Sequence, residues 1–243
     1  MPNKTERIQK TIAHSGVLSR REAEKAILEG RVTLNGKTVT ELGTQVNPCS
    51  DKIEVDHQLI KKIEKKVYLA LNKPRQVITS KKDPQNRVTV MDIIPKEFSH
   101  LNPAGRLDYD SEGLLILTND GELLHRVTHP SFQVKKKYIV KTKGIPQASD
   151  LKTLTTGVKL EDGLGKFNSV RIKEIRKDKA ILDITVTEGR NRFIRRMLDG
   201  IGYPVNRLRR VQVGSTTLGS LPTGEFQLLN TKEIENLKKS TIQ

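Results

Sequence analysis

The chain has 243 residues, of which 35% are hydrophobic, and this is enough for one main core and a small second one. Its 44 Lys and Arg residues outnumber its 28 Asp and Glu residues, and the net charge of +16 favours a polyanionic partner, above all nucleic acid. No run of 18 apolar residues predicts a membrane span or a membrane partner, and no signal-peptide core follows Met1, so we expect a cytoplasmic protein.

Charge is spread unevenly along the chain. Residues 1–62 carry a net charge of +3, and residues 63–243 carry +13. A charged stretch passes into an apolar strand pattern around Lys62, in the segment HQLIKKIEKKVYLALNKP. We therefore predict two domains, residues 1–62 and residues 63–243.

The first domain begins with helical signals. Ser19 and Glu22 form a capping box, which predicts a helix from there to a stop at Gly30. A further helix is expected over residues 6–16, and Asn35-Gly36 predicts a tight hairpin between two short strands. Two helices and a small sheet in about sixty residues bury only a thin core, which suits a binding module better than an active site.

The larger domain mixes short strands and helices. This pattern, without regular βαβ units, predicts an α+β fold with a mixed, mainly antiparallel sheet flanked by helices. It contains no Gly-rich phosphate loop and no G-x-G-x-x-G, so we expect no nucleotide and no other cofactor. Strands are expected at residues 66–72, 114–118, 136–142, 180–186 and 210–214, and helices at residues 120–129, 189–202 and 232–240.

An acidic cluster precedes one of these strands, in the segment GRLDYDSEGLLILTND at residues 105–120. A calcium-binding loop starting at Asp108 would need a bidentate Glu at its twelfth position, but Asn119 stands there and apolar residues fill the span. The apolar run instead predicts a buried strand with the carboxylates at the mouth of a sheet.

Other metal sites find no support in the sequence. His125 and His129 lie four residues apart on an expected helix without a matching third ligand, which argues against a nuclease or metal-dependent hydrolase. Cys49 is the single cysteine, so an internal disulfide and a cysteine-rich zinc site are excluded. We expect no metal.

The segment EGRNRFIRRMLDGIGYPVNRLRR holds seven arginines against Asp199 in residues 189–210. On a helix, Ile194 and its apolar neighbours at i+3, i+4 and i+7 form the buried stripe. Arg195 lies at the edge of that stripe, where a partly desolvated guanidinium needs a carboxylate partner. A solvated basic face accounts for the remaining arginines.

The segment SGVLSRREAEKAILEGRVTLNGK, residues 15–37, resembles the S4 RNA-binding domain first described in a protein of the small ribosomal subunit. From charge alone, a solvated helix face is an equal alternative, because three Glu residues alternate with the bases. The resemblance implies contacts with RNA phosphates from four side chains, those of Arg20, Arg21, Lys25 and Arg31.

Three further segments, GRLDYDSEGLLILTNDGEL, KKKYIV and EGRNRFIRRM, follow LNKP in that order. Together they resemble the RsuA/RluB-type bacterial pseudouridine synthases, which isomerise uridine in ribosomal RNA. The resemblance implies that Asp108 attacks the target nucleotide and that Arg106 enters the RNA stack as the uridine leaves. It implies that Tyr138 packs on the flipped base and that Arg195 is the basic partner of Asp108, with Ile194 beside it.

The implied reaction explains these residue types. The base must leave the stack and stay trapped while it is detached from the ribose. One carboxylate is enough if a nearby guanidinium keeps it ionised. Whether it attacks the sugar, attacks the ring or removes a sugar proton stays open, and we interpret Asp110, Glu112 and Asp120 as turn and capping residues.

The likeness of RNRFIRRM to the RluB branch favours large-subunit 23S ribosomal RNA, with 16S RNA as the alternative. With 4 Tyr, 5 Phe and no Trp, recognition should be electrostatic and shape-based around one captured base. Phosphate contacts are expected from the arginine-rich segment, at Arg190, Arg192, Arg196, Arg207 and Arg209.

The competing hypothesis is a non-catalytic RNA-binding or ribosome-assembly factor on the same scaffold. It predicts the same charge and the same first domain. The joint presence of Asp108, Tyr138 and Arg195 argues against it, because a pure binding module does not need them. In either case the expected partner is ribosomal RNA or a pre-ribosomal particle, bound by a monomer.

Overall fold

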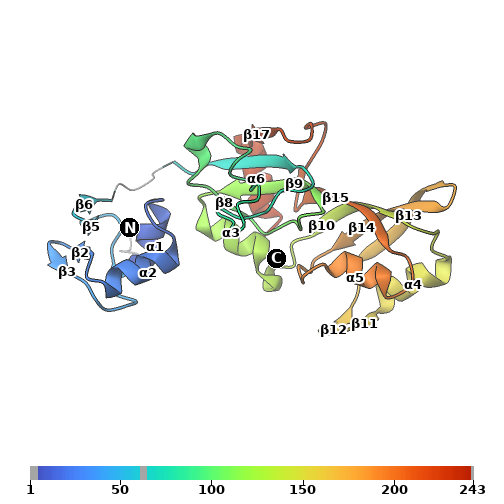
Figure 1. Ribbon diagram of the computed structural model, residues 1–243, viewed down its shortest axis with the longest axis horizontal. Coiled ribbons are helices and arrows are strands. Elements are labelled where there is room, and N and C mark those ends of the chain that lie inside the picture. The colour runs from blue at the N-terminus through green and yellow to red at the C-terminus, as the bar shows by residue number, and fades with distance from the viewer. Residues whose placement is uncertain (1–4, 61–64, 242–243) are drawn as a thin grey trace. The chain divides into compact units, whose positions relative to one another are not determined.

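The computed structural model describes residues 5–60 and 65–241. The chain divides into two compact units, Met1–Lys66 and Val67–Gln243, each with its own hydrophobic core (Figure 1). The domain boundary expected at Lys62 falls in residues 61–64, outside the described residues.

The first unit confirms the helix and hairpin signals. Ser19 Oγ accepts from the Glu22 amide at 3.3 Å, and the Glu22 carboxylate accepts from the Ser19 amide at 2.8 Å. Asn35 and Gly36 both have positive φ, as a two-residue hairpin turn requires. The elements are β1 (Glu6–Arg7), α1 (Ile8–His14), α2 (Arg20–Leu28), β2 (Val32–Leu34), β3 (Lys37–Thr38), β4 (Gln45–Val46), β5 (Ile53–Val55) and β6 (Gln58–Leu59).

The first helix is shorter than expected. Residues 6–16 were predicted as helix, but Glu6 and Arg7 pair with β4 as strand β1, so α1 begins at Ile8. Ile8 and Ile12 of α1 pack with Ile27 of α2 and with Val32 in the core of this unit.

The second unit is built on one large sheet with strand order β13-β14-β10-β15-β9-β7-β17, to which β16 and β8 add at β15 and β9. β9 and β15 pair in parallel, whereas the other ladders of this sheet are antiparallel, which confirms the predicted α+β fold. Its strands are β7 (Tyr68–Lys73), β8 (Asn102–Pro103), β9 (Glu112–Thr118), β10 (Lys136–Thr142), β13 (Ser169–Arg176), β14 (Lys179–Val186), β15 (Val205–Val213), β16 (Thr216–Thr217) and β17 (Phe226–Leu228).

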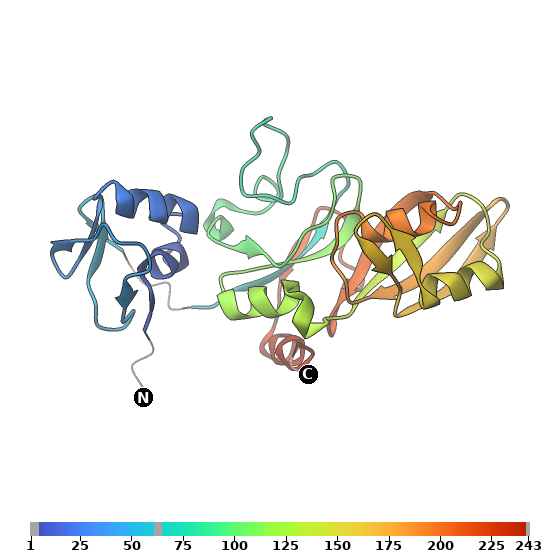
Figure 2. The same ribbon diagram turned by 90° about the horizontal axis from the view of Figure 1, so that it is seen from below.

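Helices cover both faces of this sheet (Figures 1 and 2). Because side chains alternate along a strand, Leu114 and Ile116 of β9 pack with α3 (Gly121–Thr128) and α6 (Thr231–Lys239). Leu115 and Leu117 face the other way and join the core that contains α4 (Ala148–Thr156) and α5 (Phe193–Asp199). The remaining elements are the hairpin β11 (Val158–Leu160) and β12 (Gly163–Gly165), and the single turns η1 (Lys96–Phe98) and η2 (Pro130–Phe132).

Several elements differ from the prediction. α4 and β13 were not predicted, and β15 begins at Val205 rather than at residue 210. The expected helix at residues 189–202 begins only at Phe193, because Arg192 has a left-handed φ of +47° that interrupts helical geometry.

Gly113 permits the parallel contact between β9 and β15. Its φ is +107°, and a Cβ there would overlap the main-chain oxygen of Arg210. Gly163 has a matching φ of +108° but open space around the missing Cβ, so it serves as a control for backbone strain alone.

We expect Gly163→Ala to lower the free energy of unfolding by about 1–2 kcal/mol and Gly113→Ala by about 3 kcal/mol or more in urea titrations. Equal losses would show that the overlap with Arg210 does not matter.

Candidate active site

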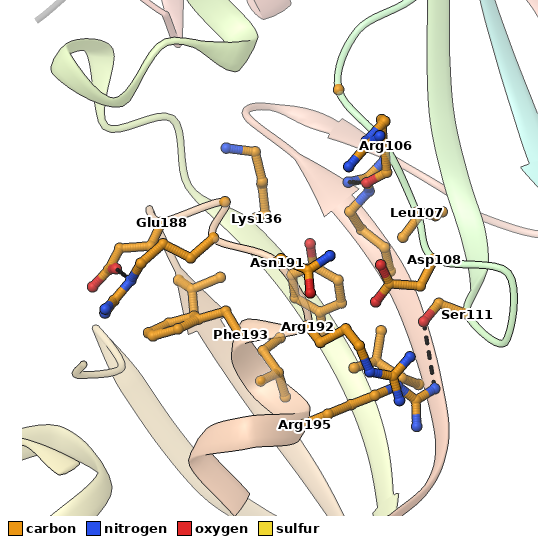
Figure 3. A pocket seen from close by; sticks show the side chains of 18 of the residues that line it. Arg106, Leu107, Asp108, Ser111, Lys136, Glu188, Asn191, Arg192, Phe193 and Arg195 are labelled. Atoms are coloured by element: carbon orange, nitrogen blue, oxygen red, sulfur yellow. Dashed lines mark hydrogen bonds and ion pairs between the residues drawn. The ribbon is translucent and has the colours of Figure 1, made fainter. Parts of the chain in front are cut away.

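A pocket of about 300 Å³ opens in the second unit between the loop before β9, the end of α3, the start of β10 and the segment leading into α5 (Figure 3). Its volume lies at the lower end of the range of roughly 300–1,000 Å³ for ligand pockets. The pocket brings together all five residues to which the sequence resemblance assigned catalytic or base-flipping roles: Arg106, Asp108, Tyr138, Ile194 and Arg195.

Side chains from other elements fix the backbone of the loop that carries Asp108. Thr79 Oγ donates to the Leu107 carbonyl at 2.8 Å and accepts from the Leu107 amide at 3.2 Å. Arg210 Nη1 donates to the Arg106 carbonyl at 3.4 Å. The Asp108 carbonyl closes a turn with the Ser111 amide at 3.0 Å. The position of Asp108 is therefore set by hydrogen bonds to its backbone and that of its neighbours.

Lys73, at the end of β7, contacts the same loop through a buried ammonium group. Its side chain has no exposed surface, and Nζ donates to the carbonyls of Pro74 at 2.9 Å, Asp108 at 3.3 Å and Ser111 at 2.9 Å. Burial lowers the pKa of Lys73 to about 8, and the charge of Arg210 adds to this, while the charge of Asp108 opposes it. The three carbonyls offset the cost of burying this ammonium group.

The Asp108 carboxylate has no such partners. It is half-buried and projects into the pocket (Figure 3). Within residues 5–60 and 65–241, no hydrogen bond or ion pair reaches its oxygens. A carboxylate held by its backbone, with both oxygens unengaged, is suited to act as a nucleophile or base toward a molecule in the pocket.

Arg195 is buried as predicted, with its side chain 8% exposed, but it does not pair with Asp108. Its Nη2 lies 3.2 Å from a carboxylate oxygen of Asp110 and also donates to the Asp110 carbonyl at 3.2 Å and to Ser111 Oγ at 3.4 Å. Burial lowers the pKa of Arg195, while the charge of Asp110 and, more weakly, that of Asp108 raise it. Arg195 and Asp108 therefore interact only through the longer-range attraction of their charges, and not through a direct ion pair.

Asp110 and Glu112 are more than turn residues, which corrects the sequence interpretation. Burial raises the pKa of Asp110, but Arg195 and Arg192 outweigh that effect and hold it below its ordinary value. Glu112 is the buried first residue of β9, and Arg207 donates to its two oxygens at 2.7 and 3.1 Å. The interpretation of Asp120 is confirmed, because it caps the N-terminus of α3.

Tyr138 and Ile194 belong to the apolar part of the pocket wall. Tyr138 lies on β10 and is 9% exposed, and Ile194 lies in the first turn of α5 and is 5% exposed. Arg106 is exposed on the pocket rim, in the loop before Asp108 (Figure 3).

Most of the other candidate arginines of this unit are engaged within the protein. Arg190 and Arg196 both bind Asp162 in the turn of the β11–β12 hairpin, at 3.1 and 2.8 Å. Arg192 binds Asp110 at 3.3 Å. Arg209 is half-buried, and its Nε has no hydrogen-bond partner in the described part of the chain. Phosphate contacts of these three arginines, and of Arg207 with its partner Glu112, would compete with the carboxylates.

In the first unit, the four candidate RNA-binding residues fall into two pairs. Arg31 binds Asp56 and Glu29, and Lys25 lies 3.6 Å from Glu29. Arg20 and Arg21 are exposed on the first turn of α2 and form no ion pair with any residue that the structure describes. Those two are the side chains most accessible to an anion.

Sequence reasoning missed Lys73, Thr79, Lys136 and Arg210. Lys73 and Lys136 lie inside the motifs LNKP and KKKYIV, so their motif positions were a usable signal. Thr79 lies outside these motifs, so no sequence signal pointed to it.

Among the described residues, no group of three or more His, Cys, Asp or Glu side chains is arranged to hold a metal ion. No helix of the described part of the chain has the length and apolar character of a membrane span.

Comparisons with known proteins match both units. Residues 67–199 match the family described as RNA pseudouridylate synthase, and residues 6–52 match the S4 domain. A Bacillus subtilis relative, named ribosomal large subunit pseudouridine synthase B, is 43% identical over 96% of this chain and 96% of its own length. A relative of the same name from Yersinia pestis is 39% identical over 96% of this chain and 76% of its own length.

A solved structure agrees with these matches. A crystal structure of a pseudouridylate synthase covers 96% of this chain and 99% of its own, with a TM-score of 0.68 and 32% sequence identity. The matched residues include every motif on which the sequence resemblance rested.

We expect Asp110→Asn to lower the free energy of unfolding by about 1–2 kcal/mol at neutral pH, because the buried Arg195 charge loses its carboxylate. Since the folded-state pKa of Asp110 is lowered, this stabilisation is present above the ordinary aspartate pKa and disappears as pH falls through the lowered value. Urea unfolding of both proteins over a descending pH series measures it. Asp162→Asn is the control, with a smaller loss because its arginine partners are more exposed. A difference that persists in acid would contradict the assignment.

Proposed function

This chain belongs to the RNA pseudouridylate synthase family, and from that premise we propose that it isomerises a uridine of large-subunit ribosomal RNA with Asp108 as the essential carboxylate. The observation that carries the proposal is the Asp108 carboxylate in the pocket, which is held by its backbone and has no partner among the residues that the structure describes. The names of the Bacillus subtilis and Yersinia pestis relatives support the choice of the large subunit.

The reaction breaks the bond between N1 of uracil and C1′ of the ribose and joins C1′ to C5 instead. The proton on C5 is released, and N1 ends protonated. The base must therefore leave the RNA stack, turn over and stay in place while it is detached. Attack on the sugar, attack on the ring and removal of a sugar proton each begin with an ionised carboxylate beside the nucleotide, and Asp108 supplies one.

The pocket walls suit a single detached base. Tyr138 and Ile194 offer an apolar surface on which a uracil ring can pack while it rotates. Arg106 fills the gap that the uridine leaves in the RNA in this proposal, and its exposure on the pocket rim supports that role. Arg195 binds Asp110 and lines the pocket together with Asp108.

The first unit has a different part in this proposal. Residues 1–62 bind RNA and place the substrate, whereas residues 63–243 carry out the isomerisation. The S4 match supports the binding role, as do Arg20 and Arg21, which form no ion pair within residues 5–60 and 65–241. We further propose that the protein acts as a monomer without a nucleotide cofactor, on ribosomal RNA or a pre-ribosomal particle in the cytoplasm.

Asp108→Asn tests the assignment, because asparagine is nearly isosteric but a poor nucleophile and base. The variant should fold, bind RNA and release no tritium from transcripts labelled at C5 of uridine. The control is Asp178→Asn, which removes an exposed carboxylate in the turn between β13 and β14. This variant should retain full turnover.

The same assay separates the two ribosomal RNAs. Unmodified large-subunit transcripts should release tritium and small-subunit transcripts should not. Near-normal turnover by folded Asp108→Asn would overturn the essential carboxylate, and release from small-subunit RNA alone would overturn the choice of substrate.

A further inference from the structure

Two cations on the pocket wall have no part in the proposed chemistry. Lys136 begins β10, two residues before Tyr138, and Arg210 on β15 lies opposite Tyr138 in the sheet register. Both line the pocket. Figure 3 shows Lys136 on the side of the pocket away from Arg195. They form a second positive region in the pocket, apart from Arg192 and Arg195.

Arg210 is buried with an unused donor group. It is 2% exposed, and its Nε donates to the Leu114 carbonyl at 2.7 Å. Its Nη1 donates to the Arg106 carbonyl at 3.4 Å, while Nη2 has no partner in the described part of the chain. Buried guanidinium groups are normally satisfied, so an unpartnered Nη2 beside a pocket indicates a missing acceptor.

Lys136 lacks an anionic partner as well. Its Nζ donates to the Val134 carbonyl at 3.2 Å, and among the described residues no carboxylate lies within ion-pair distance of either cation. Burial and the charge of Arg210 lower the pKa of Lys136 to about 8. Two neighbouring cations that are both desolvated disfavour each other's charge, and an anion would relieve both penalties.

The pocket carboxylates do not supply that anion. Glu188 accepts from Arg190 at 2.6 Å, and Asp108 exerts its charge on Lys73 and Arg195. Thr128 at the end of α3 adds no charge. The charged groups that line the pocket with Lys136 are Arg210 from β15, Arg106 and Asp108 from the loop before β9, and Glu188, Arg190, Arg192 and Arg195 from the segment leading into α5 and its first turn.

We propose that Lys136 and Arg210 form a subsite for one backbone phosphate of the RNA, next to the nucleotide whose base enters the pocket. The inference rests on the proposed function, since an extruded base carries its own phosphates to the pocket mouth. A phosphodiester offers the acceptor that Arg210 Nη2 lacks and the charge that Lys136 lacks. The subsite would fix the nucleotide by its backbone, while the apolar wall holds its base.

The structure offers a matched set of variants for a binding test. Lys136→Met removes the charge at similar length, Lys136→Arg keeps it, and Lys152→Met removes an exposed charge on α4, outside the pocket. Affinity is measured by filter binding of an unmodified large-subunit ribosomal RNA transcript over a series of salt concentrations. We expect Lys136→Met to weaken binding roughly tenfold and to lower the slope of log affinity against log salt by about 0.7 to 0.9. Lys136→Arg and Lys152→Met should resemble the unaltered chain.

The pH dependence separates a phosphate contact from a structural role. A bound phosphate raises the pKa of Lys136, so binding takes up a proton, and affinity should fall as pH rises above about 8. Lys136→Arg should remove that fall, because arginine stays charged. Unchanged affinity and slope in Lys136→Met, or equal weakening by Met and Arg, would overturn the subsite.

The two proposals fail in different ways. Tritium release by the unaltered chain scores the isomerisation, and transcript binding scores the subsite. Binding that depends on Lys136 without tritium release would leave the subsite standing and overturn the proposed function. If the chain releases tritium but its RNA affinity does not depend on Lys136, the proposed function stands and the subsite is overturned.

Discussion

The buried ammonium group of Lys73 joins the sheet to the loop that carries Asp108. Lys73 is the last residue of β7 and pairs with Gly113 of β9, so its position is fixed by the central strands. From there it donates to the carbonyls of Asp108 and Ser111. A buried charge of this kind is tolerated only while its acceptors stay in place, which means that the fold and the loop conformation stabilise each other. Together with Thr79 and Arg210, it lets the backbone hold Asp108 without engaging the carboxylate.

The three acidic residues at the start of β9 and in the loop before it have two different roles. Asp110 and Glu112 bind Arg195, Arg192 and Arg207, and these ion pairs tie the loop to α5 and β15. Asp108 alone keeps its oxygens toward the pocket. Two of the three alternating acidic residues thus have structural roles, and one has a chemical role. The arginines that neutralise the two structural carboxylates also reduce charge repulsion around the third.

Sequence patterns predicted those features that depend on residues close together in the chain, such as helix caps, tight turns and the bounds of some strands. The Ser19–Glu22 capping box and the Asn35-Gly36 turn form within a few residues, and β10 has the bounds that its apolar pattern indicated. The partners of the charged residues were not predictable in this way. Arg195 and Asp110 are 85 residues apart in sequence, and long-range contacts such as the parallel pairing of β15 with β9 bring those parts of the chain together. Motif order selected residues that the structure brings together in one pocket, but it did not predict their ion pairs.

Hydrogen bonds to the loop backbone position Asp108, and a Thr79→Val variant removes two of them. Valine keeps the shape of threonine but removes the hydroxyl that bonds both to the carbonyl and to the amide of Leu107. We expect kcat for tritium release to fall roughly tenfold or more, while the Kd for RNA stays unchanged and the protein stays folded. Unchanged kcat in a folded variant would contradict it.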